Sequence, residues 1–542
     1  MIHKKLKRSL VLGVMAISLN YGYAAQMDLS TVPPLSTQTI TTYKSIDGAT
    51  GAPVEGITFK TTSKIGIVDY TENAAALTLT DYIFDQTSLR VSGSVGANAL
   101  TLDNATFNQE TETPYMTLDN ATANAKVIFS SQPTFTGAGW IQVDTDFILE
   151  MTADIKITAP FKIADGKTLT IISGAHTITL SGIVQDLYDT GVGGNLTFSP
   201  GNAAGVLVFA AAPTFKGTFR HSNTAGATVQ LADGIDFTPN MILRAAAKIK
   251  VVDGKKARIS GAISGAFALS NTSINSTSNT VPTILELTGL NTFASFTNAG
   301  DGTTCGNVMV GSTTGLGAGV VTVSIASKLG VTADAPPSLR VNNAITATGQ
   351  TTFDISDGKT LEYNGAITGA GAAVKENLGK LILLSTTNNP ASWAHNDGGL
   401  YLGAGAKLFT ANGRSLTVGA TAANPVLGFL GNTTLQNNFV LNKLLALDPI
   451  ADIIATFSTG VWSGTSGIKN IGFGTILSSC VNTYTGESFL MPLSNFIMQA
   501  PEALGANGHA VTIHKGATLT NPDGVVITYQ SIGATALSFS QQ

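Results

Sequence analysis

Charge is scarce in this sequence. Charged residues make up 12% of its 542 residues, aromatic residues make up 7%, and the formal net charge is −4. Amphipathic helices with charged outer faces need more charge than this, so a mainly helical fold is disfavoured. Beyond the first ten residues there is no block of Lys or Arg, which argues against nucleic acid as a partner. The hydrophobic content of 43% is too high for a disordered chain.

Long hydrophobic runs are missing as well, except near the start of the chain. Four basic residues are followed by an apolar stretch from Ser9 to Leu19, and then by the small residues Gly22 and Ala24. This order is typical of a signal peptide, and the apolar stretch is too short to span a bilayer comfortably. We therefore expect residues 1–24 to be a signal peptide. The mature chain is expected to be exported and to lack a transmembrane helix.

Several motifs of enzymes are absent. The sequence contains no H-E-x-x-H, C-x-x-C or G-x-S-x-G. Two Gly-Lys-Thr triplets, beginning at Gly166 and Gly358, resemble the end of a phosphate-binding loop. The glycine that such a loop needs five residues earlier is replaced by Phe161 and Phe353. At both triplets we predict a tight turn with a solvated lysine.

Histidine and acidic residues form no recognisable cluster along the chain. His509 and His514 are a close pair, but a separation of five places them on opposite faces of a strand. Asp233 and Asp236 could flank a sugar, although a turn followed by a strand end is the simpler interpretation. The other acidic residues considered for polysaccharide cleavage are equally scattered, namely Asp186, Asp189 and Asp301. We therefore assign no catalytic residue, no cofactor and no metal site, and we do not expect an enzyme.

The three tryptophans, Trp140, Trp393 and Trp462, are isolated in the sequence. Each could stack on a glycan, because an aromatic ring offers a flat apolar face with a polar edge. Packing in a core or at the edge of a coil is the favoured interpretation.

Glycine and small polar residues are abundant instead, and they recur in imperfect repeats. The pentapeptide DGKTL occurs at Asp165 and again at Asp357, and a variant, DGKKA, begins at Asp253. Short alternating strands follow, as in GKLILLS at Gly379 and GTILSS at Gly474. Repetition of short strands bounded by turns is typical of solenoids.

The repeats favour strands over helices. In alternating runs such as Leu381 with Leu383, or Val321 with Val323, the apolar residues should face a dry interior. The best helical candidate, residues 435–457, is interrupted by a proline. Coils of about 16–25 residues leave no room for separate sandwich cores, which favours a β-solenoid.

The chain has only two cysteines, Cys305 and Cys480. In a solenoid with about 20 residues per coil, their separation of 175 residues (480 − 305) corresponds to roughly 40 Å. That distance is far beyond the reach of a disulfide. We predict two buried free thiols.

The order of the repeated units resembles the autotransporter-associated β-strand repeat of Gram-negative autotransporters. The fullest copy, from Gly464 to Leu519, contains GTSGIKNIGFGTILSS, NTYTGE and ALGANGHAVTIHKGATL. A second copy spans Ile284 to Val331, and Gly358 to Ser385 matches the first half of the unit. The resemblance implies a right-handed parallel β-helix that is exported and then displayed or released, often in an adhesive or spacer role.

Autotransporters usually end in a membrane β-barrel, and the sequence after the last repeat, ALSFSQQ, shows no such strands. We therefore expect a passenger-like chain, with a separate outer-membrane translocator as a candidate partner. The expected organisation is a signal peptide over residues 1–24, an N-terminal β-rich cap over residues 25–125, and an all-β, right-handed parallel β-helix over residues 126–542.

The leading functional hypothesis is a structural or adhesive surface stalk. Its partners would be host or matrix surface molecules or glycans, and its location the cell surface, the medium or alternatively the periplasm. One alternative is a secreted polysaccharide lyase or glycosidase on the same scaffold. The other is a self-assembling component of a surface layer or matrix.

Overall fold

The structure is a computed structural model, and it confirms the predicted fold class. It describes residues 26–28, 38–40, 58–60, 66–70, 77–91, 100–119, 125–221, 224–276, 280–300, 304–419, 424–506, 510–521, 523, 526–528 and 536–540. Within these ranges the chain is all-β, without a helix, and its parallel strands stack as a β-solenoid. The predicted right-handed winding stays a prediction.

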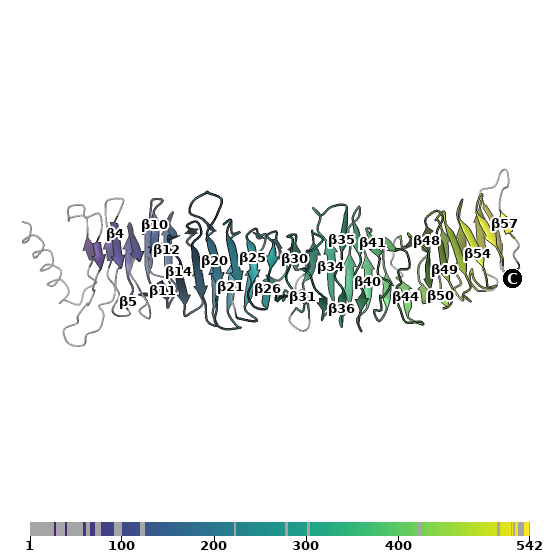
Figure 1. The fold of residues 1–542 in the computed structure, drawn as a ribbon, viewed down its shortest axis with the longest axis horizontal. Helices are drawn as coiled ribbons and strands as arrows, with labels where there is room; N and C mark the ends of the chain where they lie inside the picture. The colour runs from purple at the N-terminus through teal and green to yellow at the C-terminus, as the bar shows by residue number, and fades with distance from the viewer. Residues whose placement is uncertain are drawn as a thin grey trace, which may run out of the picture. The chain divides into compact units, whose positions relative to one another are not determined.

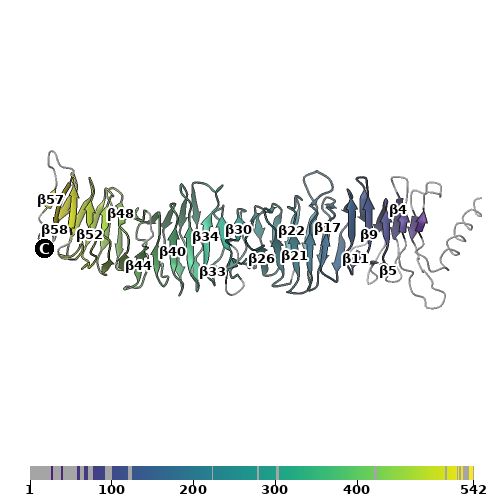
Figure 2. The ribbon, with the colours of Figure 1, turned by 180° about the vertical axis from the view of Figure 1, so that it is seen from behind.

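The chain divides into two compact units. The first comprises the described residues within 1–250 and 260–267, and the second comprises those within 251–259 and 268–542. Figures 1 and 2 show short strands stacked in successive turns within each unit.

In the first unit, strands that lie far apart in the sequence become neighbours in the same sheet. One sheet contains β1 (Gln26–Asp28), β3 (Thr58–Lys60), β6 (Ile83–Asp85), β9 (Thr106–Gln109) and β12 (Thr134–Gly137). The next contains β2 (Gln38–Ile40), β4 (Gly66–Tyr70), β7 (Thr87–Val91), β10 (Pro114–Leu118), β13 (Trp140–Val143), β16 (Phe161–Ile163) and β19 (Val184–Asp186). Another contains β5 (Leu77–Thr80), β8 (Leu100–Asp103), β11 (Ala125–Phe129), β14 (Phe147–Met151), β17 (Thr168–Ile172), β20 (Asn195–Phe198), β22 (Thr218–His221), β25 (Asn240–Leu243) and β28 (Ile263–Ser264). The remaining strands are β15 (Ile155–Ile157), β18 (Thr177–Leu180), β21 (Val206–Phe209), β23 (Thr228–Leu231), β24 (Asp236–Phe237) and β26 (Ala247–Val251).

The second unit repeats this plan. One ladder contains β27 (Lys256–Ile259), β30 (Ile284–Leu287), β32 (Asn307–Val310), β34 (Ser327–Val331), β37 (Thr351–Asp354), β40 (Ala373–Glu376), β42 (Trp393–His395), β44 (Ser415–Val418), β47 (Asn438–Leu441) and β50 (Trp462–Gly464). A second contains β35 (Ser338–Val341), β38 (Thr360–Tyr363), β41 (Lys380–Leu383), β43 (Gly399–Leu402), β45 (Val426–Phe429), β48 (Leu445–Pro449), β51 (Ile468–Asn470), β53 (Ser488–Leu490), β55 (Ala510–His514) and β58 (Ala536–Ser540). The others are β29 (Ala268–Asn271), β31 (Ser295–Asn298), β33 (Val321–Val323), β36 (Ile345–Ala347) and β39 (Ile367–Thr368), followed by β46 (Thr433–Leu435), β49 (Ile454–Phe457), β52 (Thr475–Ser478), β54 (Asn495–Met498), β56 (Thr518–Thr520) and β57 (Val526–Thr528).

Coil length varies along the second unit. Leu381 pairs with Leu400, 19 residues later (400 − 381). Leu400 then pairs with Leu427, 27 residues later (427 − 400). The strands keep their register while the connecting turns absorb the difference, because insertions at a solenoid corner leave the interior rungs unchanged.

Burial of alternate residues along the strands builds much of the interior. Leu381 and Leu383 are fully buried, and Val321 and Val323 are 2% and 3% exposed, as predicted. Between them in the sequence, Ile382 and Thr322 face outward. Alternate burial follows from the period of two along a strand.

The best helical candidate is not a helix. Residues 435–457 contain the end of β46, then β47 and β48, and finally β49. Pro449 closes β48, and Asp452 has a φ of 65°, which turns the chain between two strands. The apolar spacing that imitates a helix arises because strand alternation is interrupted by turns every few residues.

The two ends of the chain bear on three sequence-based expectations: the signal peptide, the boundary of the N-terminal cap and the end of the solenoid. Residues 1–24, expected to be a signal peptide, lie outside the described residues. The N-terminal cap was expected to end at residue 125. Parallel pairing continues past this position, because β8 pairs with β11 and β10 pairs with β13. At the other end, β58 pairs with β55 and β57 pairs with β56, both antiparallel. This reversal was not anticipated, and it places an antiparallel strand where the parallel ladder would otherwise present an open edge.

Candidate functional site

Buried asparagines occupy the corners of the second unit. Asn291 donates from Nδ2 to the Gly315 oxygen at 2.8 Å. Asn482 donates in the same way to the Ala503 oxygen, 2.7 Å away. These two asparagines begin the Asn-Thr-aromatic units of the sequence, and their acceptors belong to the glycine-rich turn of the next coil. The repeated motif therefore has a structural role, because it satisfies a buried carbonyl group from one coil to the next.

The Gly-Lys-Thr triplets are turns, as predicted. Gly166 and Gly358 have φ values of 68° and 72°, in the left-handed region that favours glycine. Strands β17 and β38 follow them, where a phosphate loop would open a helix. Lys167 is exposed, but Lys359 is not fully solvated, because its ammonium group donates to the Ala335 oxygen.

Two of the three tryptophans are core residues. Trp393 is fully buried and Trp462 is 2% exposed. The Trp393 indole donates from Nε1 to the Leu408 oxygen at 3.1 Å. Trp140 lies at the surface of the first unit, with the Lys162 ammonium nitrogen 3.6 Å from its ring centroid. One face of the Trp140 ring is thus already covered by a cation.

Those candidate metal and acidic residues that the structure describes form no metal site. His509 and Asp301 lie outside the described residues, and His514 is a partly exposed residue of β55. Asp233 lies in a turn and Asp236 begins β24, as the simpler interpretation predicted. Over the part of the chain that the structure describes, no group of three or more His, Cys, Asp or Glu could hold a metal ion.

Asp186 and Asp189 stabilise a loop of the first unit. The Asp186 carboxylate accepts hydrogen bonds from the backbone nitrogens of Gly194 and Lys216, at 2.7 and 2.9 Å. Asp189 forms an ion pair with the Lys216 ammonium group, which holds the pKa of the Asp189 carboxyl below its usual range. Both carboxylates therefore have structural partners.

Two pairs of carboxylates sit on neighbouring rungs. In the second unit Asp354 pairs in register with Glu376, and Lys328 Nζ lies 3.5 Å from Asp354 and 2.6 Å from Glu376. The cation between the two acids makes this an ion-pair ladder on the outer face of a sheet.

The second pair, Asp119 and Asp144, lies in the first unit. The Asp144 nitrogen donates to the Leu118 oxygen at 3.0 Å, which places the two acids on adjacent rungs. Asp119 pairs with Arg90, whereas the Asp144 carboxylate accepts from Gln142 Nε2 at 2.9 and 3.0 Å. Burial raises the pKa of Asp144, and repulsion from Asp119 raises it further. The Gln142 hydrogen bond and the charge of Arg90 act in the opposite direction.

The interior of the second unit contains a lysine beside a histidine. Lys375 and His395 pair in register on β40 and β42, and both are fully buried. The Lys375 ammonium group donates to the backbone oxygens of Glu376, Asn377 and Asp397, at 2.7, 2.5 and 3.2 Å. Burial lowers the pKa of Lys375 to about 8. This lysine holds a corner together and is shielded from any ligand in solvent.

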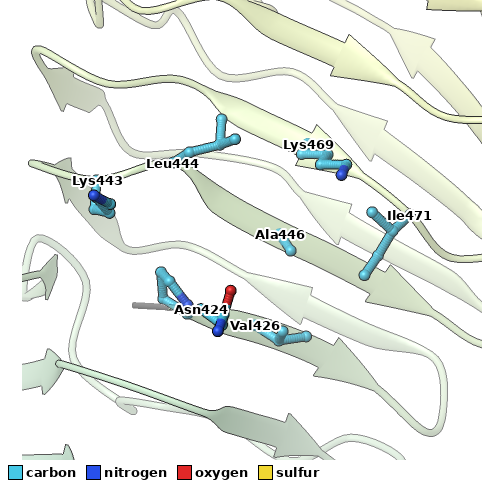
Figure 3. Close-up of a pocket in the computed structure, with 8 residues that line it drawn as sticks. Asn424, Val426, Lys443, Leu444, Ala446, Lys469 and Ile471 are labelled. Carbon is cyan, nitrogen blue, oxygen red and sulfur yellow. The ribbon is translucent and has the colours of Figure 1, made fainter. Parts of the chain in front are cut away.

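A pocket of about 350 Å³ lies on the outer face of the second unit, across three neighbouring strands (Figure 3). Its lining residues are Asn424, Pro425, Val426, Lys443, Leu444, Ala446, Lys469 and Ile471. Val426 of β45 pairs with Ala446 of β48, and Ala446 pairs with Lys469 of β51. The residues that line the pocket on these strands alternate with buried ones such as Leu427 and Leu447.

A glycine seats an aromatic ring beside the pocket. Two residues further along the same two strands as Val426 and Ala446, Gly428 pairs with Asp448. A Cβ on Gly428 would lie 2.1 Å from the Tyr401 ring, so the ring lies directly over this glycine. The Tyr401 hydroxyl donates a hydrogen bond to the Asp448 carboxylate at 3.0 Å, and burial raises the pKa of Tyr401.

The pocket is cationic along its walls. Lys443 is exposed and Lys469 is partly exposed. Across the described ranges neither ammonium group has an ion-pair partner. Asn424 adds a side-chain amide, and Val426, Ala446 and Ile471 supply apolar surface. Two ammonium groups, an amide and an apolar floor suit a small anionic ligand.

Sequence reasoning missed this pocket. The local signal is a small outward-facing residue, Ala446, between the larger Val426 and Lys469 on the neighbouring rungs. Recognising it requires the coil register, and that register is not visible in the sequence because coil lengths vary.

No protein-family model matches the chain, and no match is found among curated proteins or solved structures. Over the described residues, no helix is long and apolar enough to cross a membrane.

Proposed function

We propose that this chain is an exported structural or adhesive β-solenoid, a passenger-like stalk related to the autotransporter-associated repeat proteins. Its outer faces would make repeated weak contacts with host or matrix surface molecules or glycans. The observation that carries this proposal is the use of the repeated asparagines, since Asn291 and Asn482 hold consecutive coils together. The repeat that dominates the second half of the sequence thus maintains the scaffold.

The proposed mechanism is multivalent contact. Rungs of a parallel sheet repeat about every 4.8 Å, so similar outward side chains recur at fixed spacing along a face. Several weak contacts on a stiff support raise the overall affinity well above that of any one contact.

A secreted polysaccharide lyase or glycosidase is the second candidate, and the pair Asp119 and Asp144 favours it. A carboxyl group with a raised pKa beside a second carboxylate is the arrangement that glycoside hydrolysis uses. Cleavage of an acidic or neutral polysaccharide by the purified chain, abolished in Asp144→Asn, would support an enzyme. Absence of cleavage across such a panel would leave the scaffold proposal in place.

The test of the scaffold proposal is protease treatment of intact cells of the native host. The protein is followed by antibody in the cell, membrane and medium fractions, with a periplasmic protein as the control. Loss of signal from intact cells, or recovery in the medium, is the expected result. Protection until the outer membrane is opened would contradict a surface adhesin. Concentration-dependent sheets or filaments of the purified protein in electron microscopy would favour a self-assembling surface layer instead.

A further inference from the structure

We propose that the pocket lined by Lys443 and Lys469 binds the anionic group of an acidic saccharide, that is, a sugar carrying a carboxylate or a sulfate. The proposal rests on the adhesive function proposed above and gives it a chemical target. It comes from the second unit alone and uses three neighbouring strands, β45, β48 and β51.

The charge of the pocket selects an anion. Lys443 and Lys469 both line it, and no carboxylate is among its lining residues. Some other cations on the same unit are neutralised by carboxylates: Lys328 contacts two, and Arg340 pairs with Glu362. Two ammonium groups without ion-pair partners at one pocket favour a negative ligand and would repel a divalent cation.

The shape and the remaining surface select a sugar. The volume of about 350 Å³ lies at the lower end of small-molecule sites, which run from about 300 to 1,000 Å³. Val426, Ala446 and Ile471 offer an apolar floor against which the C–H face of a pyranose ring can lie (Figure 3). Asp448 lies two residues beyond Ala446 on β48 and can accept a hydrogen bond from a sugar hydroxyl group.

Tyr401 shapes the neighbouring wall. Its ring lies over Gly428, its hydroxyl contacts Asp448, and the Lys380 ammonium group is 5.2 Å from its centroid. Asp448 is therefore held in place beside the pocket, which favours a fixed orientation of the ligand over a diffuse attraction.

The test is titration calorimetry on the full chain at low salt. The probes are a disaccharide that ends in glucuronic acid, the matching disaccharide that ends in glucose, sodium sulfate and sodium acetate. The acidic disaccharide is expected to bind more tightly than the other three. Equal affinity for the neutral disaccharide would overturn the role of the anion. Equal affinity for free sulfate or acetate would overturn the saccharide and leave only a general anion site.

Matched variants assign the binding to the pocket. Lys443→Gln and Lys469→Gln should each weaken binding of the acidic disaccharide at least about tenfold, because each removes one charge-assisted hydrogen-bond donor. Lys469→Arg should retain most of the affinity. Lys515→Gln removes the same charge from an exposed residue outside the pocket and should change nothing. An equal loss in all three glutamine variants would place the interaction elsewhere.

A negative result in this binding experiment can be told apart from a failure of the proposed adhesive function. Binding to the purified chain does not require surface display, so a periplasmic location would leave it unaffected. Conversely, a chain that adheres to host or matrix surfaces but ignores the acidic disaccharide would overturn the pocket assignment only.

Discussion

Asn482 joins three consecutive coils of the second unit. Its Oδ1 accepts a hydrogen bond from the Trp462 nitrogen at 3.1 Å, and its Nδ2 donates to the Ala503 oxygen at 2.7 Å. Asn388 does the same, accepting from the Ile367 nitrogen and donating to the Lys407 oxygen, both at 2.9 Å. A side-chain amide suits this position because it carries both a donor and an acceptor.

Replacing Asn482 should loosen these coils. Asn482→Ala leaves the buried Trp462 nitrogen and Ala503 oxygen without this partner, which should lower the free energy of unfolding by about 1–3 kcal/mol. Solenoid coils can open locally, so hydrogen exchange of peptides containing Trp462 and Ala503 is the direct measurement. Asn442→Ala, at an exposed position, is the control and should leave the exchange unchanged. Equal protection in the two variants would show that the amide bridge does not stabilise the coils.

The alternation of β41 can be tested with two adjacent residues. Leu383 is fully buried, whereas Ile382 points outward. Leu383→Asp should lower the free energy of unfolding by more than about 3 kcal/mol, because it buries an unpaired charge. Ile382→Asp adds the same charge to the same strand and should cost much less. Thermal unfolding of both variants measures the difference, and similar midpoints would refute the assignment of the interior face.

Local patterns were enough to predict the strands and the turns. Leu381 and Leu383 alternate with outward residues, and Gly358 follows an aspartate, so both features depend only on immediate neighbours. Lys359 is only partly solvated, and this could not be predicted because its acceptor, the Ala335 oxygen, comes from the preceding coil.

Features that depend on contacts between coils could not be predicted. Lys375 looks like a surface residue in the sequence, yet it is fully buried, because the oxygens of Glu376, Asn377 and Asp397 surround its ammonium group. The pocket has the same cause, since Val426, Ala446 and Lys469 meet only after two coils of different length have closed.

Gly428 determines the position of the Tyr401 ring. Gly428→Ala would place a Cβ 2.1 Å from the present ring, so the ring must swing outward and lose its contact with Asp448. Burial and the Asp448 carboxylate now raise the pKa of Tyr401. In the variant, spectrophotometric titration should therefore show an additional tyrosine that ionises near its ordinary pKa of about 10.

The second substitution identifies that tyrosine. Adding Tyr401→Phe to the Gly428→Ala chain should remove the additional group from the titration. If the Gly428→Ala chain titrates like the parent, the ring does not rest on this glycine.

The His395 imidazole should make the second unit sensitive to acid. His395 is fully buried beside the Lys375 ammonium group, and burial lowers its pKa to about 4. Its Nε2 lies 3.0 Å from the Val426 oxygen, so Nε2 carries the proton of the neutral ring. Between pH about 6.5 and about 4 the unfolded chain therefore binds a proton that the folded chain does not. Stability should fall as the pH is lowered through this window, by up to about 3 kcal/mol from this group alone.

The comparison with His395→Gln isolates this contribution from that of the carboxylates. Glutamine retains an N–H donor for the Val426 oxygen but cannot take up a proton in this range. Denaturant unfolding at pH 7.5, 5.5 and 4.5 should therefore show a steeper loss of stability in the parent than in the variant. Parallel pH dependence in the two proteins would mean that the imidazole is not held in its neutral form, and the burial of His395 beside Lys375 would then require another explanation.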